Sequence, residues 1–174
     1  DESDGGVPGA QLSAHAVIQV QNLHKSFGDV QALRGVSFEI PSGAVVGFLG
    51  PNGAGKTTAI KILTGYLAAD QGTARICGHD VESEPLAAKA LVGYLPENNP
   101  LYTDMRVEQY LSFAWKAQMG KGVAGESKGE AIDRVVQATS LQMVFRRNIG
   151  DCSKGYRQRV GLAQALLHDP PLLV

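Results

Sequence analysis

The feature that most constrains the fold of this chain is a glycine-rich stretch that fits the pattern G-x-x-x-x-G-K-[ST]. It consists of Gly50, Pro51, Asn52, Gly53, Ala54, Gly55, Lys56, Thr57 and Thr58. Glycines let the backbone bend so that several N–H groups point at one anion. Lys56 can reach the outer phosphates of a nucleotide, and the Thr57 hydroxyl can hold a Mg²⁺ ion that bridges them. The pattern therefore predicts a loop that binds the phosphates of a nucleotide together with Mg²⁺.

The segments on either side of the loop come in the order that such a loop requires. Residues 44–49 are a short apolar run, which is typical of a buried parallel strand. Apolar residues recur at helical spacing over residues 60–67. We therefore expect a helix to begin near Lys56 and to direct the positive end of its dipole at the phosphates. The alternative is a glycine-rich turn that matches by chance, and the order strand, loop, helix argues against it.

The composition is that of one globular domain of ordinary size. The chain has 174 residues, and 44% of them are hydrophobic, which is enough for a core. A formal net charge of -1 does not suggest a bulk nucleic-acid or membrane-surface binder, and no apolar run has the length of a membrane span. Cys77 and Cys152 lie far apart in the sequence and are interpreted as reduced thiols of a cytosolic protein.

Both ends of the chain have distinctive compositions. Residues 1–15 are polar and contain glycine, so we expect a disordered tail there. They lack the basic start and the apolar stretch of a secretory signal. The chain starts without Met and stops inside an apolar run at Val174, and we therefore expect both ends to be cut.

The rest of the chain divides into a β-rich first part and a helix-rich second part. Strands are expected at 16–20, 36–40 and 73–77, forming a small antiparallel unit in which the third strand pairs with the first two. Residues 78–81 are expected to form a loop. Further strands are expected at 92–95 and after residue 171, and helices at 86–90, 107–119, 130–140 and 153–168. Residues 98–152, with a connector at 120–129, are then a helical insertion in an α/β core.

A second informative stretch runs from Cys152 to Arg159. Ser153 is a residue type that caps helix N-termini. A serine hydroxyl and the N–H of Gly155 at a helix start can together form another anion-binding end. An ordinary capped helix is the alternative, and this stretch taken alone favours that alternative.

With both stretches in view, residues 17–174 resemble the ATP-binding subunits of ABC transporters. The phosphate loop matches the Walker A motif, and Ser153 and Gly155 match the signature motif, with Gln158 and Arg159 as its usual continuation. Residues 93–97 lie where the family has its Q-loop. Phe27 lies where the family has an aromatic residue that stacks on adenine. The amino-acid sequences of residues 94–102 and 154–159 are most similar to those of bacterial exporters of the multidrug, gliding-motility and ABC-2 kind.

The resemblance implies a fold and a mode of action. The fold is α/β, a P-loop NTPase of the ABC type with an N-terminal antiparallel β subdomain and a helical insertion. ATP with Mg²⁺ is the implied cofactor, held between Lys56 and Thr57 of one subunit and Ser153, Lys154 and Gly155 of the next. The implied partners are a second ATP-binding subunit, identical or not, and a membrane-spanning permease, but no nucleic acid. The implied location is the cytoplasmic face of the cell membrane.

The chain departs from the family pattern at several positions. Cys152 replaces the signature Leu, and Lys154 and Tyr156 replace a Gly and a Gln. Glu97 replaces the Q-loop Gln, and with Thr57 it is a predicted ligand of the Mg²⁺ shell. The Walker B Asp and the catalytic Glu of the family would follow Val174, so no catalytic residue is predicted within the sequence. We therefore expect an incomplete domain that binds ATP without hydrolysing it, whereas the parent protein is an ATPase.

Several alternatives remain open at this stage. One is another P-loop enzyme, such as a kinase or GTPase, although the guanine-selecting pattern N-K-x-D is absent from the sequence. A soluble ABC-type ATPase of DNA repair or translation is a second, and a non-catalytic binding fragment is a third. Tyr102 and Trp115 are predicted contacts for the permease, with ordinary core packing as the equal alternative.

Overall fold

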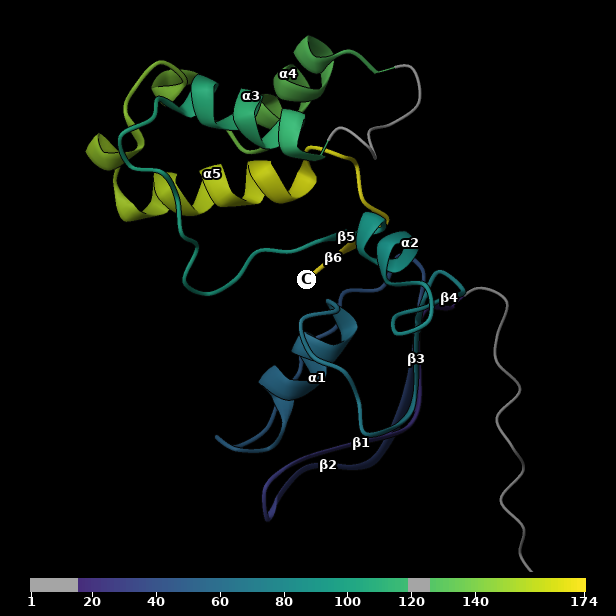
Figure 1. Cartoon of the computed structure of the whole chain (residues 1–174). Coiled ribbons are helices and arrows are strands. Elements are labelled where there is room, and N and C mark those ends of the chain that lie inside the picture. The colour runs from purple at the N-terminus through teal and green to yellow at the C-terminus, as the bar shows by residue number, and fades with distance from the viewer. Residues whose placement is uncertain (1–15, 119–125) are drawn as a thin grey trace, which may run out of the picture. The chain divides into compact units, whose positions relative to one another are not determined.

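The computed structural model describes residues 16–118 and 126–174 (Figure 1). The described residues form two compact units, with the division between residues 84 and 85. The predicted tail at 1–15 and most of the predicted connector at 120–129 lie outside the described residues. None of the helices in the described ranges is long and apolar enough to cross a membrane.

The first unit is built on a four-stranded antiparallel sheet. Its strands are β1 (Ala16–Phe27), β2 (Val30–Pro41), β3 (Gln71–Ile76) and β4 (His79–Asp80), in the order β2-β1-β3-β4. Ile18 and Val20 alternate into the core as expected of a half-buried strand. A shift in register between Val20 and Leu23 places one extra residue in β1, and Leu23 is buried as well.

Three predictions about this sheet need correction. The first two strands are longer than predicted, because the hairpin turn lies at Gly28 and Asp29 and the polar residues before it continue the ladder. The third strand pairs with β1 but not with β2, since β1 lies between them. The predicted loop at 78–81 contains the short strand β4, which pairs Asp80 with Arg75.

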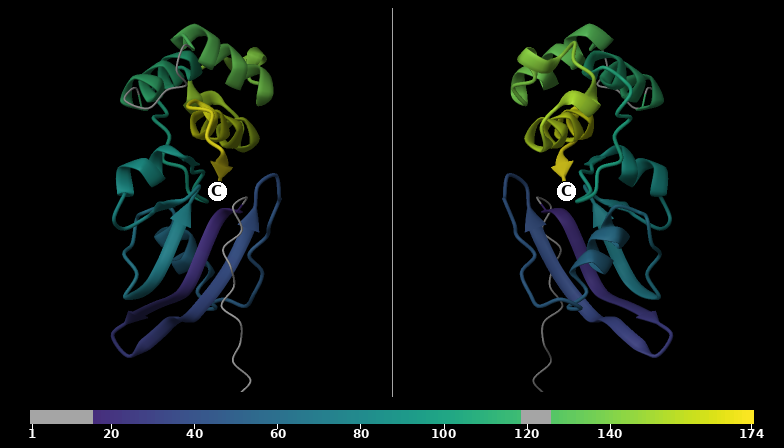
Figure 2. Two further views of the ribbon diagram at one scale, coloured as in Figure 1. Left: turned by 90° about the vertical axis from the view of Figure 1, so that its right-hand side faces the viewer. Right: turned by 90° about the vertical axis from the view of Figure 1, so that its left-hand side faces the viewer.

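The strand predicted at residues 44–49 is wrong. These residues are exposed and have no regular structure, and the side chains of Val45 and Leu49 are 103% and 94% exposed. A strand is stable only when its backbone N–H and C=O groups meet a neighbouring strand. No strand in the described residues pairs with this segment. The predicted helix behind it does form, as α1 (Lys56–Leu63), and lies beside the sheet (Figure 2) with Ala59, Ile62 and Leu63 buried.

The second unit consists mainly of helices. Its elements are α2 (Pro85–Ala90), β5 (Val92–Gly93), α3 (Val107–Gln118), α4 (Lys128–Ala138), the 3-10 turns η1 (Gln142–Val144) and η2 (Ile149–Asp151), α5 (Lys154–Leu166) and β6 (Leu172–Leu173). The four predicted helices are confirmed within a few residues at each end. The two short strands are parallel, with Val92 opposite Leu172. Only Val92 and Gly93 of the predicted strand at 92–95 belong to β5.

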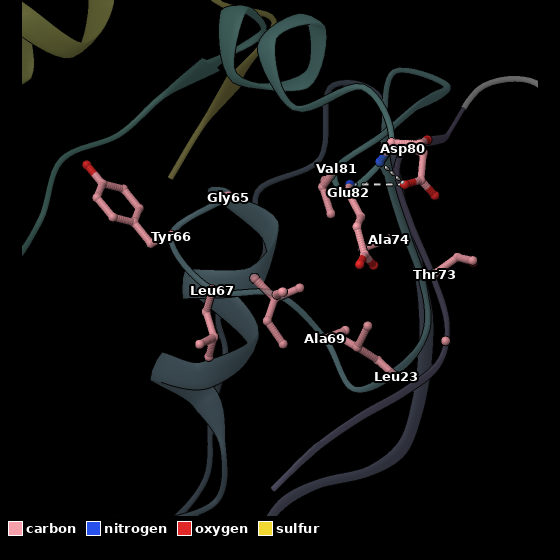
Figure 3. Close-up of a pocket in the computed structure, with 14 residues that line it drawn as sticks. Leu23, Gly65, Tyr66, Leu67, Ala69, Thr73, Ala74, Asp80, Val81 and Glu82 are labelled. Carbon is pink, nitrogen blue, oxygen red and sulfur yellow. Dashed lines mark hydrogen bonds between the residues drawn. The ribbon is translucent and has the colours of Figure 1, made fainter. Parts of the chain in front are cut away.

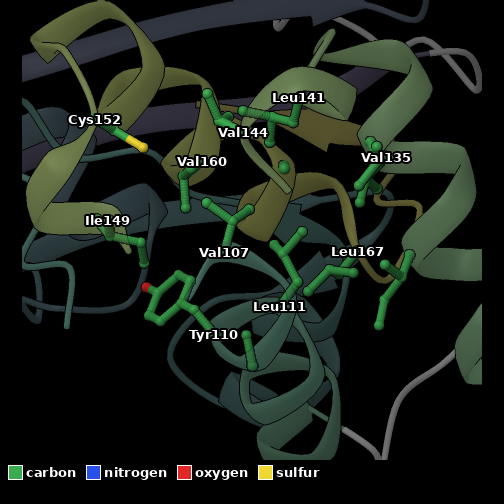
Figure 4. Close-up of a cluster of buried hydrophobic side chains, with 14 residues drawn as sticks. Val107, Tyr110, Leu111, Val135, Leu141, Val144, Ile149, Cys152, Val160 and Leu167 are labelled. Atoms are coloured by element: carbon green, nitrogen blue, oxygen red, sulfur yellow. The ribbon is translucent and has the colours of Figure 1, made fainter. Parts of the chain in front are cut away.

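Helices α3, α4 and α5 enclose one apolar core (Figure 4). Leu111 of α3, Val135 of α4 and Val160 of α5 are fully buried in it. Cys152 is also part of this core, and its Sγ donates to the backbone oxygen of Asn148 at 3.4 Å. Cys152 therefore fills an apolar position of this core. The predicted boundaries of a helical subdomain at 98–152 stay a prediction.

Candidate functional site

The phosphate loop owes its shape to glycines in left-handed backbone conformations. Gly53 and Gly55 have φ angles of 85° and 84°, which other residue types rarely adopt. A Cβ atom on Gly55 would collide with the backbone oxygen of Ala32 and the side chain of Leu33 in β2. Strand β2 and the start of α1 can therefore approach this closely only because position 55 is a glycine.

The N-terminus of α1 is open. Gly55 is its N-cap residue and offers no side chain, and the first turn contains no acidic residue. The N–H groups of that turn are therefore left to an external acceptor, and the helix dipole favours an anion there. The Lys56 ammonium donates to the backbone oxygens of Gly50 and Pro51, at 2.7 Å for the second, and Thr57 is exposed beside it. These groups fit the phosphates of a nucleotide, and the role of the Thr57 hydroxyl as a Mg²⁺ ligand stays a prediction.

The predicted adenine-stacking residue is presented at the end of β1. The side chain of Phe27 is 51% exposed, directly before the hairpin turn. The Lys25 ammonium lies 5.8 Å from the centroid of its ring. An exposed aromatic face of this kind can receive a planar base, and its role stays a prediction.

The second unit carries the predicted signature residues. Ser153 is the N-cap of α5, and its Oγ accepts from the backbone N–H of Tyr156 at 3.3 Å. The ordinary capping interpretation is therefore correct for the helix itself. Lys154 and Gly155 are exposed in the first turn, and no acidic residue accompanies them. This end of α5 combines a cation, exposed N–H groups and the positive end of the dipole, which suits an anion.

The structure brings Glu97 and Lys154 to one cavity of the second unit. The cavity measures about 800 Å³ and lies between the loop of residues 95–101 and helix α5, with Arg157 and Gln158 also in its wall. Glu97 itself is exposed. Within the described residues no group of three or more His, Cys, Asp or Glu side chains could hold a metal ion. The role of Glu97 as a ligand of the Mg²⁺ shell stays a prediction.

The two predicted permease contacts differ in exposure. Trp115 is partly buried against the helical core, in line with the packing alternative. Tyr102 is 57% exposed and makes edge-to-face contacts with the rings of Tyr110 and Phe113. Only Tyr102 of the pair lies open to a partner.

Asp70 makes contacts that the sequence analysis did not predict. Its carboxylate accepts from the Lys25 ammonium and from the backbone N–H of Ser26, both at 2.7 Å. The bond from Lys25 and that from Ser26 hold the pKa of this carboxyl below its ordinary value. An Asp directly before a strand is a known acceptor for backbone N–H groups, but the sequence does not reveal that its partners are more than forty residues away.

The first unit also has a cavity that sequence analysis did not predict (Figure 3). It measures about 490 Å³, and residues from the end of α1, from β3 and from the turn after β4 line it. In that turn Asp80 accepts from the N–H groups of Glu82 and Ser83, both at 3.0 Å (Figure 3). Although burial opposes it, these N–H groups lower the pKa of the Asp80 carboxyl. None of the predicted site residues lies in this cavity.

Comparison with known proteins gives consistent results over most of the chain. The family described as ABC transporter matches residues 33–174. The probable multidrug ABC transporter ATP-binding protein YbhF of Escherichia coli is 34% identical over 168 residues, which are 97% of this chain and 28% of that protein. The ABC transporter ATP-binding protein YhcH of Bacillus subtilis is 38% identical over 91% of this chain and 50% of its own length. The Nod factor export ATP-binding protein I of Burkholderia lata is 34% identical over 91% of this chain and 51% of its length.

Solved structures give the same assignment of the fold. An ATP-binding subunit of an ABC transporter superposes with a TM-score of 0.75 at 27% identity, over 90% of this chain and 64% of that one. An ATP-binding cassette in its ADP conformation superposes with a TM-score of 0.76 at 24% identity, over 91% and 67%. The chain spans about half the length of most of these curated relatives, or less. The predicted fold class is confirmed, and the sequence match over residues 33–174 means that the chain belongs to the ABC transporter family.

Proposed function

We propose that this chain is the ATP-binding, energy-coupling part of an ABC-type exporter. The open N-terminus of α1 is the observation that carries the proposal. Its Gly55 cap leaves the N–H groups of the first turn to an external acceptor, and Lys56 lies within the same loop. Export is supported by the names of two relatives, one a probable multidrug transporter protein and one a Nod factor export protein.

Each loop residue has a distinct role in this proposal. The N–H groups of residues 55–57 and the Lys56 ammonium bind the phosphates, and Thr57 holds Mg²⁺. Phe27 stacks on the adenine, and Glu97 contributes to the metal shell. Bound ATP supplies the phosphoryl group whose transfer to water would drive transport in the parent ATPase.

The chain acts with two kinds of partner. A second ATP-binding subunit, identical or not, presents Ser153, Lys154 and Gly155 to the nucleotide. Their exposure at the positive end of α5 supports this arrangement. A membrane-spanning permease is the other partner, and it holds the protein at the cytoplasmic face of the membrane. The exposed ring of Tyr102 is suited to contact it.

Isothermal titration of the 174-residue chain with Mg·ATP tests the proposal. We expect saturable binding that is lost in Lys56→Ala, because that substitution removes the cation nearest the phosphates. Lys61→Ala is the matched control, since Lys61 lies in the last turn of the same helix and is exposed. Binding that is equally strong in wild type and Lys56→Ala would refute the proposal. Phosphate release measured on the same samples tests the expectation that this chain binds ATP without turnover.

A further inference from the structure

The last residues of β1 have a strand neighbour on one side only. Toward β2, Ser26 pairs with Gln31 and Phe27 pairs with Val30. Toward β3 the ladder stops at the pair of His24 and Gln71. The end of β1 that presents Phe27 therefore projects past the sheet along one edge, and a strand end with one partner frays readily.

Asp70 lies beside β1 where the pairing with β3 has ended, and it supplies hydrogen bonds that a further residue of β3 would have made. Its backbone N–H donates to the oxygen of His24 at 2.9 Å. Its carboxylate then accepts from the Ser26 N–H at 2.7 Å, so a side chain supplies the next acceptor along the edge. The other carboxylate oxygen holds the Lys25 ammonium at 2.7 Å.

The Lys25 ammonium links this contact to the aromatic ring. The side chain of Lys25 is only 14% exposed, and the ammonium lies 5.8 Å from the centroid of the Phe27 ring. Phe27 is thus held by the paired backbone at Ser26 and by a cation fixed through Asp70. The ring itself stays half exposed and accessible to a ligand.

We propose that Asp70 is a positioning residue for the base-stacking surface of Phe27. This inference rests on the proposed function, because it assigns Asp70 a role in binding the base of ATP. Asp70 touches no phosphate-loop residue through a described hydrogen bond, so its effect should be confined to the base. Stacking requires a ring that is already oriented, since ordering it at the moment of binding would lower the affinity.

The experiment compares two ligands that share a chain of three phosphates, of which only ATP carries the adenosine group with its base. Titrations with Mg·ATP and with Mg·tripolyphosphate are made on wild type, Asp70→Ala, Phe27→Ala and the double variant. Asp80→Ala is the matched control. Asp80 also accepts two backbone N–H groups in the first unit, but its strand pairs through Arg75 with Gln19, far from Phe27 along β1.

We expect Asp70→Ala to raise the dissociation constant for ATP about three- to tenfold and to leave that for tripolyphosphate unchanged. Phe27→Ala should raise the ATP value about five- to a hundredfold, in the range of base stacking on an aromatic side chain. In the Phe27→Ala background the Asp70 substitution should add nothing. Asp80→Ala should alter neither ligand.

Three results would overturn the inference while leaving the proposed function intact. The first is an ATP affinity of Asp70→Ala equal to that of wild type. The second is an equal loss of affinity for ATP and for tripolyphosphate in Asp70→Ala. The third is an Asp70→Ala substitution that weakens ATP binding as much in the Phe27→Ala background as in wild type. Absence of Lys56-dependent ATP binding in wild type would overturn both. If alanine prevents folding, Asp70→Asn keeps the volume and one acceptor oxygen, and a smaller, base-specific loss is expected. Amide exchange gives a direct reading, since Ser26 should lose protection in Asp70→Ala, which has no acceptor oxygen, while Val20 keeps it.

Discussion

Arg134 ties helix α4 to the end of helix α5, and its removal should destabilise the second unit. The guanidinium donates to the backbone oxygens of Leu166 and Leu167, both at 3.1 Å. It also forms a two-pronged pair with Glu126, at 2.8 and 2.9 Å. The last carbonyls of a helix lack partners within the helix, so a cation that caps them stabilises it.

The magnitude follows from these contacts. A hydrogen bond that involves a charged group contributes about 1.5–3 kcal/mol, and a surface ion pair about 0–1 kcal/mol. The Arg134 side chain is 34% exposed, so water replaces part of the loss. Leu166 also keeps its bond from the N–H of Asp169. We therefore expect Arg134→Met, which retains the apolar stem, to lower the free energy of unfolding by about 2 kcal/mol.

Urea unfolding followed by tryptophan fluorescence measures this change. Trp115 is the only tryptophan of the chain, and it packs against the core of the second unit. Arg106→Met is the matched control, because it removes an arginine whose ion pair lies at the surface. The Arg106 side chain is 54% exposed, and its guanidinium lies 3.7 Å from a carboxylate oxygen of Glu108. This substitution should cost less than about 0.5 kcal/mol. An Arg134→Met variant no less stable than Arg106→Met would refute the capping argument.

The difference in stability between wild type and Arg134→Met should also depend on pH. The hydrogen bond from Arg134 lowers the pKa of Glu126 in the folded state. A depressed carboxyl pKa contributes stability above the ordinary glutamate value of about 4.3, and this contribution is lost as pH falls through the folded-state pKa. The stability difference between wild type and Arg134→Met should therefore be constant from pH 6 to 8 and should shrink below about pH 4.3. A difference that stays constant down to pH 3 would contradict this.

Three further tests of packing and capping use the same urea assay. Leu111→Ala, at a side chain with 0% exposure, should cost about 2–5 kcal/mol, against less than about 1 kcal/mol for Phe113→Ala on the exposed side of α3. Gly161→Ala should cost about 1–3 kcal/mol, because the new Cβ would overlap the Asn99 amide, and adding Asn99→Ala should restore much of it. Ser127→Ala removes the capping box of α4 and should cost about 1 kcal/mol. The packing described for α3 would be contradicted if Leu111→Ala and Phe113→Ala lowered the free energy of unfolding equally. The packing described at Gly161 would be contradicted if Asn99→Ala restored none of the lost stability. The capping of α4 would be contradicted if Ser127→Ala were as stable as wild type.

Features that depend on neighbours in the chain were predictable from the sequence. The phosphate loop needs residues able to adopt positive φ, and Gly53 and Gly55 provide them within three positions. Ser153 caps a helix that begins at the next residue. The helices that form the second core follow from apolar residues at helical spacing. Each of these features is set by residues only a few positions apart, so a short stretch of sequence contains all the residues that are needed to predict it.

Features that need a partner far along the chain were decided only by the tertiary structure. Residues 44–49 have the composition of a buried strand, but a strand forms only where another strand meets it, and no described strand does. The contact between Asp70 and Ser26 joins residues 44 positions apart, and the local sequence around either residue does not predict the other as its partner. Cys152 reads as a departure from the signature motif, yet its side chain is buried in the apolar core that contains residues of α3, α4 and α5. The sequence thus determined the loop and the helices, whereas strand pairing and the support of Phe27 required the fold, because their free energy comes from groups that folding alone brings together.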